Sequence, residues 1–139
     1  MPGELVGSWF TGDLSNIQFY DPVTGSWADP NGEGFYFIFN PDGTYEEGAV
    51  INSTSYTCSF RLLGRAVGTF AATTDTLTLY QQERRTQAAG NCSGAGENVE
   101  GPATTVYGWS LGTDEYGNEG LSLFLEDGTL YGTFYPWGE

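Results

Sequence analysis

The 139-residue sequence contains no histidine, and this absence removes several classes of function. Without histidine there is no Ser-His-Asp triad, no Cys-His pair and no histidine-ligated zinc or haem. Basic residues are also scarce, since only four arginines and no lysine stand against 18 acidic residues, for a net charge of -14. Such a charge argues against nucleic acid and anionic membrane surfaces as partners. We therefore expect no metal site, no cofactor and no nucleic-acid partner.

Long apolar runs are missing too, and none approaches the roughly 20 residues of a membrane helix, so we expect no membrane insertion. The sequence has only two cysteines, too few for a four-thiolate metal site. Cys58 lies in a strand-like run and Cys92 lies in a glycine-rich loop, so they form either a disulfide or two buried thiols. A bond that ties a flexible loop to a strand stabilises that loop most, which favours the disulfide and an oxidising compartment.

The apolar residues of the sequence follow the pattern of β-strands, and the clearest example of this pattern runs from Gly34 to Ile51. Aromatic and β-branched residues alternate from Phe35 to Phe39, and both faces are apolar, as in a strand covered on two sides. The sequence Asn-Pro-Asp-Gly that follows has the chemistry of a turn. A return strand from Thr44 completes a predicted hairpin, and its Tyr45 and Glu47 share one face.

Similar patterns recur along the whole chain, whereas no segment has a helical period. Strands are predicted at 4–11, 58–63, 66–72, 76–84, 104–111, 120–125 and 129–135, with Gly64-Arg65 as a tight connection and 87–102 as a loop. Residues 12–32 are irregular and are a candidate lid. Eight or nine strands with short turns predict an all-β, antiparallel up-and-down barrel of about eight strands, with residues 1–139 as a single domain.

Three motifs resemble those of bacterial lipocalin-like domains of the calycin superfamily. They are Gly7-Ser8-Trp9 near the start, Phe-x-Phe-x-Pro-Asp-Gly-Thr-Tyr from Phe37 to Tyr45, and Tyr20-Asp21-Pro22 with Gly25 and Trp27. The resemblance implies a lipocalin-like barrel in which Trp9 closes one end. It also pushes the prediction toward a cavity that holds a ligand, as opposed to a solid core.

The aromatic residues at strand positions suggest what such a cavity would bind. A barrel of about eight strands has room inside for one small ligand, and tyrosine and tryptophan offer apolar walls with polar tips. We therefore predict a binding protein for a small, largely apolar molecule, with the ligand at the end away from Trp9. The predicted ligand-binding residues are Phe37, Tyr45, Tyr80, Tyr107, Trp109, Leu123 and Tyr131.

Two other functions stay open at this point. One is a barrel cyclase or isomerase acting on a hydrophobic substrate, with Glu47 as a weak candidate for the proton donor because a buried carboxyl group has a raised pKa. The other is an extracellular interaction, inhibitor or structural protein with a filled barrel and an aromatic patch at Phe19, Tyr20 and Trp27. We expect a secreted, periplasmic or cell-surface protein, although residues 1–4 do not resemble a signal peptide.

Overall fold

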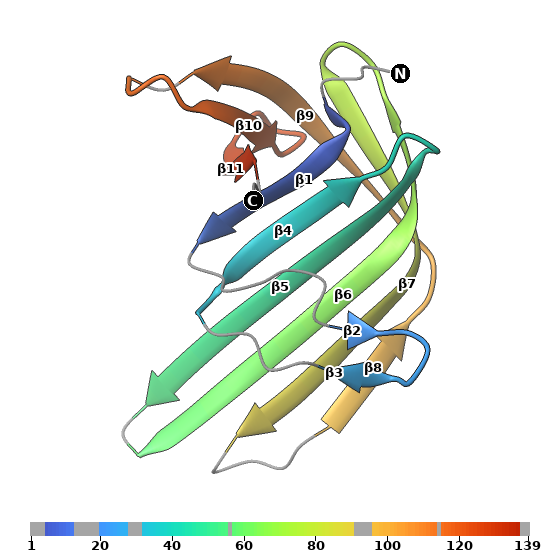
Figure 1. The fold of residues 1–139 in the computed structure, drawn as a ribbon, viewed down its shortest axis with the longest axis vertical. Coiled ribbons are helices and arrows are strands. Elements are labelled where there is room, and N and C mark those ends of the chain that lie inside the picture. The colour runs from blue at the N-terminus through green and yellow to red at the C-terminus, as the bar shows by residue number, and fades with distance from the viewer. Residues whose placement is uncertain are drawn as a thin grey trace.

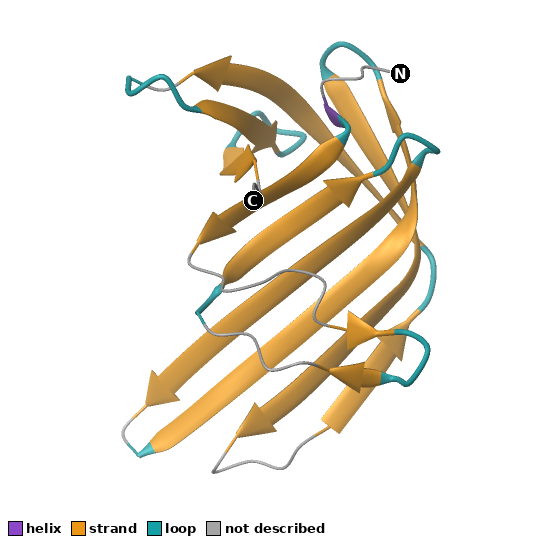
Figure 2. Cartoon of the chain, in the orientation of Figure 1, coloured by secondary structure: helices purple, strands orange, loops and turns teal. Residues whose placement is uncertain are grey.

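The computed structural model describes residues 5–12, 20–27, 32–55, 57–90, 96–113 and 115–136. Strands dominate these residues and there is almost no helix, so the all-β prediction is confirmed (Figure 2). The strands are β1 (Gly7–Gly12), β2 (Tyr20–Asp21), β3 (Ser26–Trp27), β4 (Gly34–Phe39), β5 (Thr44–Ser55), β6 (Cys58–Ala72), β7 (Thr76–Gly90), β8 (Gly96–Glu100), β9 (Ala103–Thr113), β10 (Glu119–Phe124) and β11 (Leu130–Pro136).

Eight of these strands close into one antiparallel barrel (Figure 1). Each pairs with the next barrel strand along the chain, in the order β1, β4, β5, β6, β7, β9, β10 and β11, and β11 returns to pair with β1. All of these pairs are antiparallel, which gives the predicted up-and-down barrel. No helix among the described residues is long and apolar enough to cross a membrane.

The turn between β4 and β5 forms as its residues predict. The backbone N–H of Asn40 donates a hydrogen bond to the Thr44 carbonyl at 2.9 Å. The Asp42 carboxylate accepts one from the backbone N–H of Thr44 at 3.0 Å. Gly43 has a φ of 91°, a conformation that other residues rarely adopt. This turn sets the register in which Phe37 lies opposite Glu47, so the odd-numbered residues of both strands point into the barrel.

The inward-pointing side chains pack into one apolar cluster. Trp9 is only 4% exposed, and its indole N–H donates to the Leu5 carbonyl at 3.0 Å. The Phe37 ring lies 5.6 Å from the Phe39 ring and 5.1 Å from the Phe134 ring, measured between centroids. The other members are Tyr45, Phe70, Leu77, Leu79, Tyr107, Trp109, Leu121 and Leu123.

The strands β5, β6 and β7 continue past the closed part of the barrel (Figure 1). β7 pairs with β9 from Thr76 to Gln81, and then with β8 from Arg84 to Ala88. Its register with β6 shifts between these two segments, at Val67/Gly68, as in a β-bulge. Because β4 stops pairing with β5 at Val50, a sheet of β5, β6, β7 and β8 projects from the barrel.

Two local predictions are wrong in this projecting sheet. Gly64 and Arg65 lie in the middle of β6 and form no connection, because β5 and β7 supply backbone partners on both sides of β6. The predicted loop at 87–102 contains the end of β7 and all of β8. Cys58, the first residue of β6, is disulfide-bonded. Its predicted partner, Cys92, lies outside the described residues, so that pairing stays a prediction.

The β2–β3 hairpin, which falls within the predicted lid, lies against the outer wall of the barrel (Figure 1). The guanidinium groups of Arg65 and Arg85 lie 5.4 Å and 5.5 Å from the centroid of the Tyr20 ring. Trp27 packs on an outer apolar cluster formed by Tyr36, Ile38, Val50 and Leu63. Tyr20 and Trp27 are therefore half-buried and do not form the exposed patch that the sequence suggests, and Phe19 lies outside the described residues.

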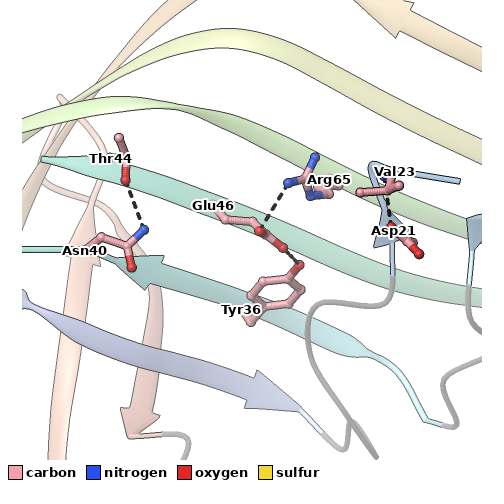
Figure 3. A network of polar contacts seen from close by, with 7 residues as sticks. All are labelled: Asp21, Val23, Tyr36, Asn40, Thr44, Glu46 and Arg65. Atoms are coloured by element: carbon pink, nitrogen blue, oxygen red, sulfur yellow. Dashed lines mark hydrogen bonds and ion pairs between the residues drawn. The ribbon is translucent and has the colours of Figure 1, made fainter. Parts of the chain in front are cut away.

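The buried carboxylate of Glu46 on β5 connects side chains of the neighbouring strands β4 and β6 in this outer wall (Figure 3). Glu46 is only 9% exposed, accepts a hydrogen bond from the Tyr36 hydroxyl, and lies 3.4 Å from the Arg65 guanidinium. The Tyr36 ring covers Gly48 on the next strand, and an added Cβ on Gly48 would overlap that ring. The absence of a side chain at residue 48 therefore lets Tyr36 reach Glu46.

The Gly48→Ala variant should lose roughly 1–3 kcal/mol of the free energy of unfolding, because its methyl group displaces a buried ring. Gly64→Ala is the matched control, since an added Cβ there meets no atom within 4 Å. Urea denaturation of both variants measures the difference, and equal stability would show that Tyr36 does not depend on Gly48.

The Trp9→Ala variant should lose about 3–5 kcal/mol, as expected for a large cavity in a packed interior. The free energy of unfolding from chemical denaturation tests this. A loss below about 1 kcal/mol, which is typical of surface positions, would contradict the burial of Trp9.

Candidate functional site

The structure places most of the predicted ligand-binding residues inside the barrel, packed against one another. Phe37, Tyr45, Tyr107, Trp109 and Leu123 are buried members of the interior cluster. Tyr131 is half-exposed, and its ring centroid lies 5.2 Å from that of Tyr107. Tyr80 does not point inward as predicted, because it is 46% exposed and lies on the outer face, next to the inward-pointing Leu79. These side chains form the packing core of the barrel.

Glu47 shares its strand face with Tyr45, as predicted, and the structure shows that this face points into the barrel, where Glu47 forms an ion pair. Its carboxylate lies 3.1 Å from the guanidinium of Arg84, whose Nε also donates to the Gln81 side chain at 3.0 Å. Burial raises the pKa of Glu47, and Arg84 opposes that shift. Burial and the nearby Glu47 charge raise the pKa of Tyr45 to about 12. The carboxylate of Glu47 is thus held in an ion pair with Arg84.

The acidic residues do not gather into a metal site in the part of the chain that is described. No three Asp, Glu, His or Cys side chains lie there in an arrangement that could hold an ion.

The arginine side chains differ in their contacts. Arg84 and Arg85 point to opposite faces of β7, as expected in a strand, and Arg85 pairs with Glu97 at 2.7 Å and Glu83 at 3.4 Å.

The inner face of the projecting sheet carries a group of half-exposed apolar side chains, which we call the apolar shelf. It consists of Ile51 on β5, Phe60 and Leu62 on β6, and Ala88 on β7. Ile51 lies opposite Leu62, and Leu62 lies opposite Ala88, so the shelf crosses three strands. Ile51 is 36% exposed and Phe60 is 38% exposed. Apolar side chains that gather on one exposed face are typical of interaction surfaces.

Space is open above this shelf. An added Cβ on Gly96 of β8, which lies opposite Ala88, would meet no atom within 4 Å. A hollow of about 420 Å³ next to Ile51 extends the apolar surface toward the ends of β1 and β4, and Phe35 is part of its lining. Within the described part of the chain, Ile51 and Phe60 therefore keep more than a third of their surface exposed, in contrast to the buried residues of the interior cluster.

Sequence reasoning missed this shelf because it divided β6 at Gly64-Arg65. With that break, Phe60 and Leu62 belong to a short separate strand, and their side chains have no reason to share a face with Ile51. The available signal is the alternation Cys58, Phe60, Leu62, Gly64, Ala66, which continues through the glycine without a change of phase. Whether the face is covered depends on β1 and β4 stopping early, which the pattern does not specify.

The raised pKa of the buried Glu47 lets us predict how the free energy of unfolding changes with pH. Its folded-state pKa is raised, so the folded protein binds more protons than the unfolded chain between the unfolded pKa near 4.5 and the raised folded value. The contribution of Glu47 is thus complete below that window and falls as pH rises through it.

We therefore expect Glu47→Gln to flatten the decline of stability with rising pH above about 4.5, measured by urea denaturation at several pH values. Glu126→Gln, at an exposed turn, is the matched control and should retain the slope of the native protein. An unchanged slope in Glu47→Gln would contradict the burial of this carboxyl group.

Comparison with known proteins gives a family that the motifs did not suggest. The model of the family Rot1, described as a fungal chaperone for protein folding within the endoplasmic reticulum (ER), matches residues 5–136. Two curated relatives are "Protein rot1" of Aspergillus clavatus and "Protein rot1" of Aspergillus oryzae. Each is 32% identical over 78 residues, which cover 52% of this chain and 33% or 34% of the relative. The matched part is thus about a third of the length of these relatives.

These matches overturn several predictions. The bacterial lipocalin-like assignment is wrong, although the barrel architecture is correct. The family is described as a chaperone for protein folding, which overturns the prediction of a small apolar molecule as the partner and of a small-molecule binding protein as the function. The isomerase and extracellular alternatives find no support either, and a secreted, periplasmic or cell-surface location conflicts with a family that acts within the ER.

The family model extends over all eight barrel strands, the projecting sheet and the outer hairpin, which is nearly the whole chain. This protein therefore belongs to the fungal Rot1 family.

Proposed function

We propose that this domain assists protein folding in the ER by binding apolar segments of incompletely folded polypeptides on its outside. The observation that carries the proposal is the match of the Rot1 family model to residues 5–136. An unfolded polypeptide is too large for the interior of a barrel of eight strands, which holds at most one small ligand. Binding on an open surface is therefore the physically reasonable mode.

The apolar shelf is the surface that fits this role. Incompletely folded proteins expose apolar side chains, and contact with Ile51, Phe60 and Leu62 would remove both surfaces from water. The interior cluster cannot serve in this way, because its residues are buried and hold the barrel together. The strands that carry the shelf, β5, β6 and β7, are also strands of the closed barrel. A segment bound on the shelf would therefore not need to change the fold of the domain.

The net charge of -14 also suits a protein that binds aggregation-prone polypeptides. Strong negative charge keeps copies of the domain apart and soluble, so an exposed apolar surface does not lead directly to self-association. The same charge favours client segments that carry basic residues next to apolar ones. Short apolar contacts with modest area would release a client readily, which suits a protein that must not retain folded products.

The domain should suppress the aggregation of denatured citrate synthase, measured by light scattering over a range of domain concentrations. In the variant Ile51→Ser/Phe60→Ser, each replaced side chain loses about 1 kcal/mol of apolar contact with the client. Together the two losses come to about 2 kcal/mol, so on the order of thirtyfold more of this variant should be needed for the same suppression.

Leu130→Ser is the matched control, because Leu130 is 53% exposed and lies on the outer face of β11 opposite Phe124. It should suppress aggregation as well as the native domain does. Equal activity of the native domain and the shelf variant would show that the shelf is not the binding surface. A native domain without any suppression would contradict the proposed function itself.

A further inference from the structure

The strand β8 offers an edge to which a further strand could be added. β8 is the last strand in the order of the sheet, and no described strand pairs with its outer edge. All five of its residues are exposed. β9 follows along the same side of β7 after Gly101 and Pro102, and its pairing with β10 begins only at Gly108. Residues 96–100 and 103–107 thus form one interrupted edge, the β8–β9 edge.

An edge of this kind presents a row of backbone N–H and C=O groups to whatever lies beside it. Extended peptides bind such edges by adding a strand, in which backbone hydrogen bonds supply affinity without regard to sequence. Natural proteins usually protect exposed edges with charges, prolines or a covering segment. Here Glu97, Glu100 and Pro102 provide some protection, but all the residues of β8 remain exposed.

The charges along the edge decide which partner it fits. Residues 96–107 contain no basic residue and two acidic ones, Glu100 and Glu97, of which Glu97 also pairs with Arg85 at 2.7 Å, and the whole chain carries a charge of -14. A second copy of this chain would bring the same acidic edge and the same net charge, so like-charge repulsion opposes pairing between copies. A basic segment would meet complementary charge, which raises its rate of association and steers it to this edge.

The inner face next to the edge has room for the side chains of an added strand. Gly96 lies opposite Ala88, which lies opposite Leu62 of the apolar shelf. An added Cβ on Gly96 would meet no atom within 4 Å. An apolar side chain of an added strand beside Gly96 would therefore border the shelf, while the outward side chains of that strand would lie beside Val99, which is 50% exposed.

We propose that the β8–β9 edge binds an extended, basic segment of an unfolded polypeptide as an additional β-strand. This inference rests on the proposed function and specifies how that function engages its client. Backbone hydrogen bonds at the edge provide affinity for many sequences, the acidic residues select basic segments, and the shelf accepts the apolar side chains of the same segment.

The test uses the whole chain and a labelled short peptide of alternating lysine and valine. Binding is measured by fluorescence anisotropy, and amide hydrogen exchange locates the bound peptide on the protein. Exchange should slow at residues 96–107 in the complex. The same peptide with N-methylated central residues, which lacks the backbone donors, should bind at least about tenfold more weakly. A peptide with glutamate in place of lysine should also bind at least about tenfold more weakly.

The variant Glu100→Gln should weaken binding of the lysine peptide about two- to threefold at low salt, because one exposed charge of the edge is lost while the ion pair of Arg85 with Glu97 is kept. Glu119→Gln is the matched control, since it removes one charge at the exposed first residue of β10. That control should bind as the native chain does, and circular dichroism should show that both variants are folded.

Three results would overturn the proposal: equal binding of the N-methylated peptide, protection elsewhere than residues 96–107, or self-association of the chain through this edge. The outcome is separable from the proposed function, because aggregation suppression is measured independently. Suppression of aggregation without protection of the edge would reject the edge and leave the function standing. Absence of suppression would reject the function itself.

Discussion

The change of partner along β7 is the constraint on which the rest of this structure depends. Over its first half, β7 pairs with β9 and closes the barrel, and over its second half it pairs with β8 and leaves the ring. The register shift at Val67/Gly68 reverses which residues of β7 point inward, so Leu79 before it and Arg84 after it share the inner face. One extra residue thus separates a closed core from an open shelf.

The adjacent residues Glu46 and Glu47 show how a strand distributes two charges between two environments. Glu46 points outward and is held by Tyr36 and Arg65 beneath the outer hairpin. Glu47 points inward and pairs with Arg84. A buried carboxylate without a partner would be costly, so each requires its arginine. Two of the four arginines are therefore used to stabilise buried acids.

The motifs at Trp9 and from Phe37 to Tyr45 illustrate the difference between a fold and a function. They specify packing and a tight turn, which any up-and-down barrel needs, and they say nothing about what touches the outside of the barrel. The small-molecule interpretation assumed that tyrosine and tryptophan at inward positions line a cavity. The ring distances between Phe37, Phe39 and Phe134 instead describe a packed cluster. Membership of the Rot1 family is the reason why we propose a functional surface on the exterior.

The sequence by itself determined the fold class, the hairpin at Gly43 and the shared face of Tyr45 and Glu47, because alternation and turn chemistry are local properties of the chain. It did not reveal the continuity of β6 through Gly64, since the partners that keep a glycine in a strand come from distant segments. Tyr80 was misplaced because a period-two pattern leaves open which of its two faces is buried. Only the tertiary structure decided where β1 and β4 end relative to β5, and hence that Ile51 and Phe60 remain exposed while Phe37 is covered.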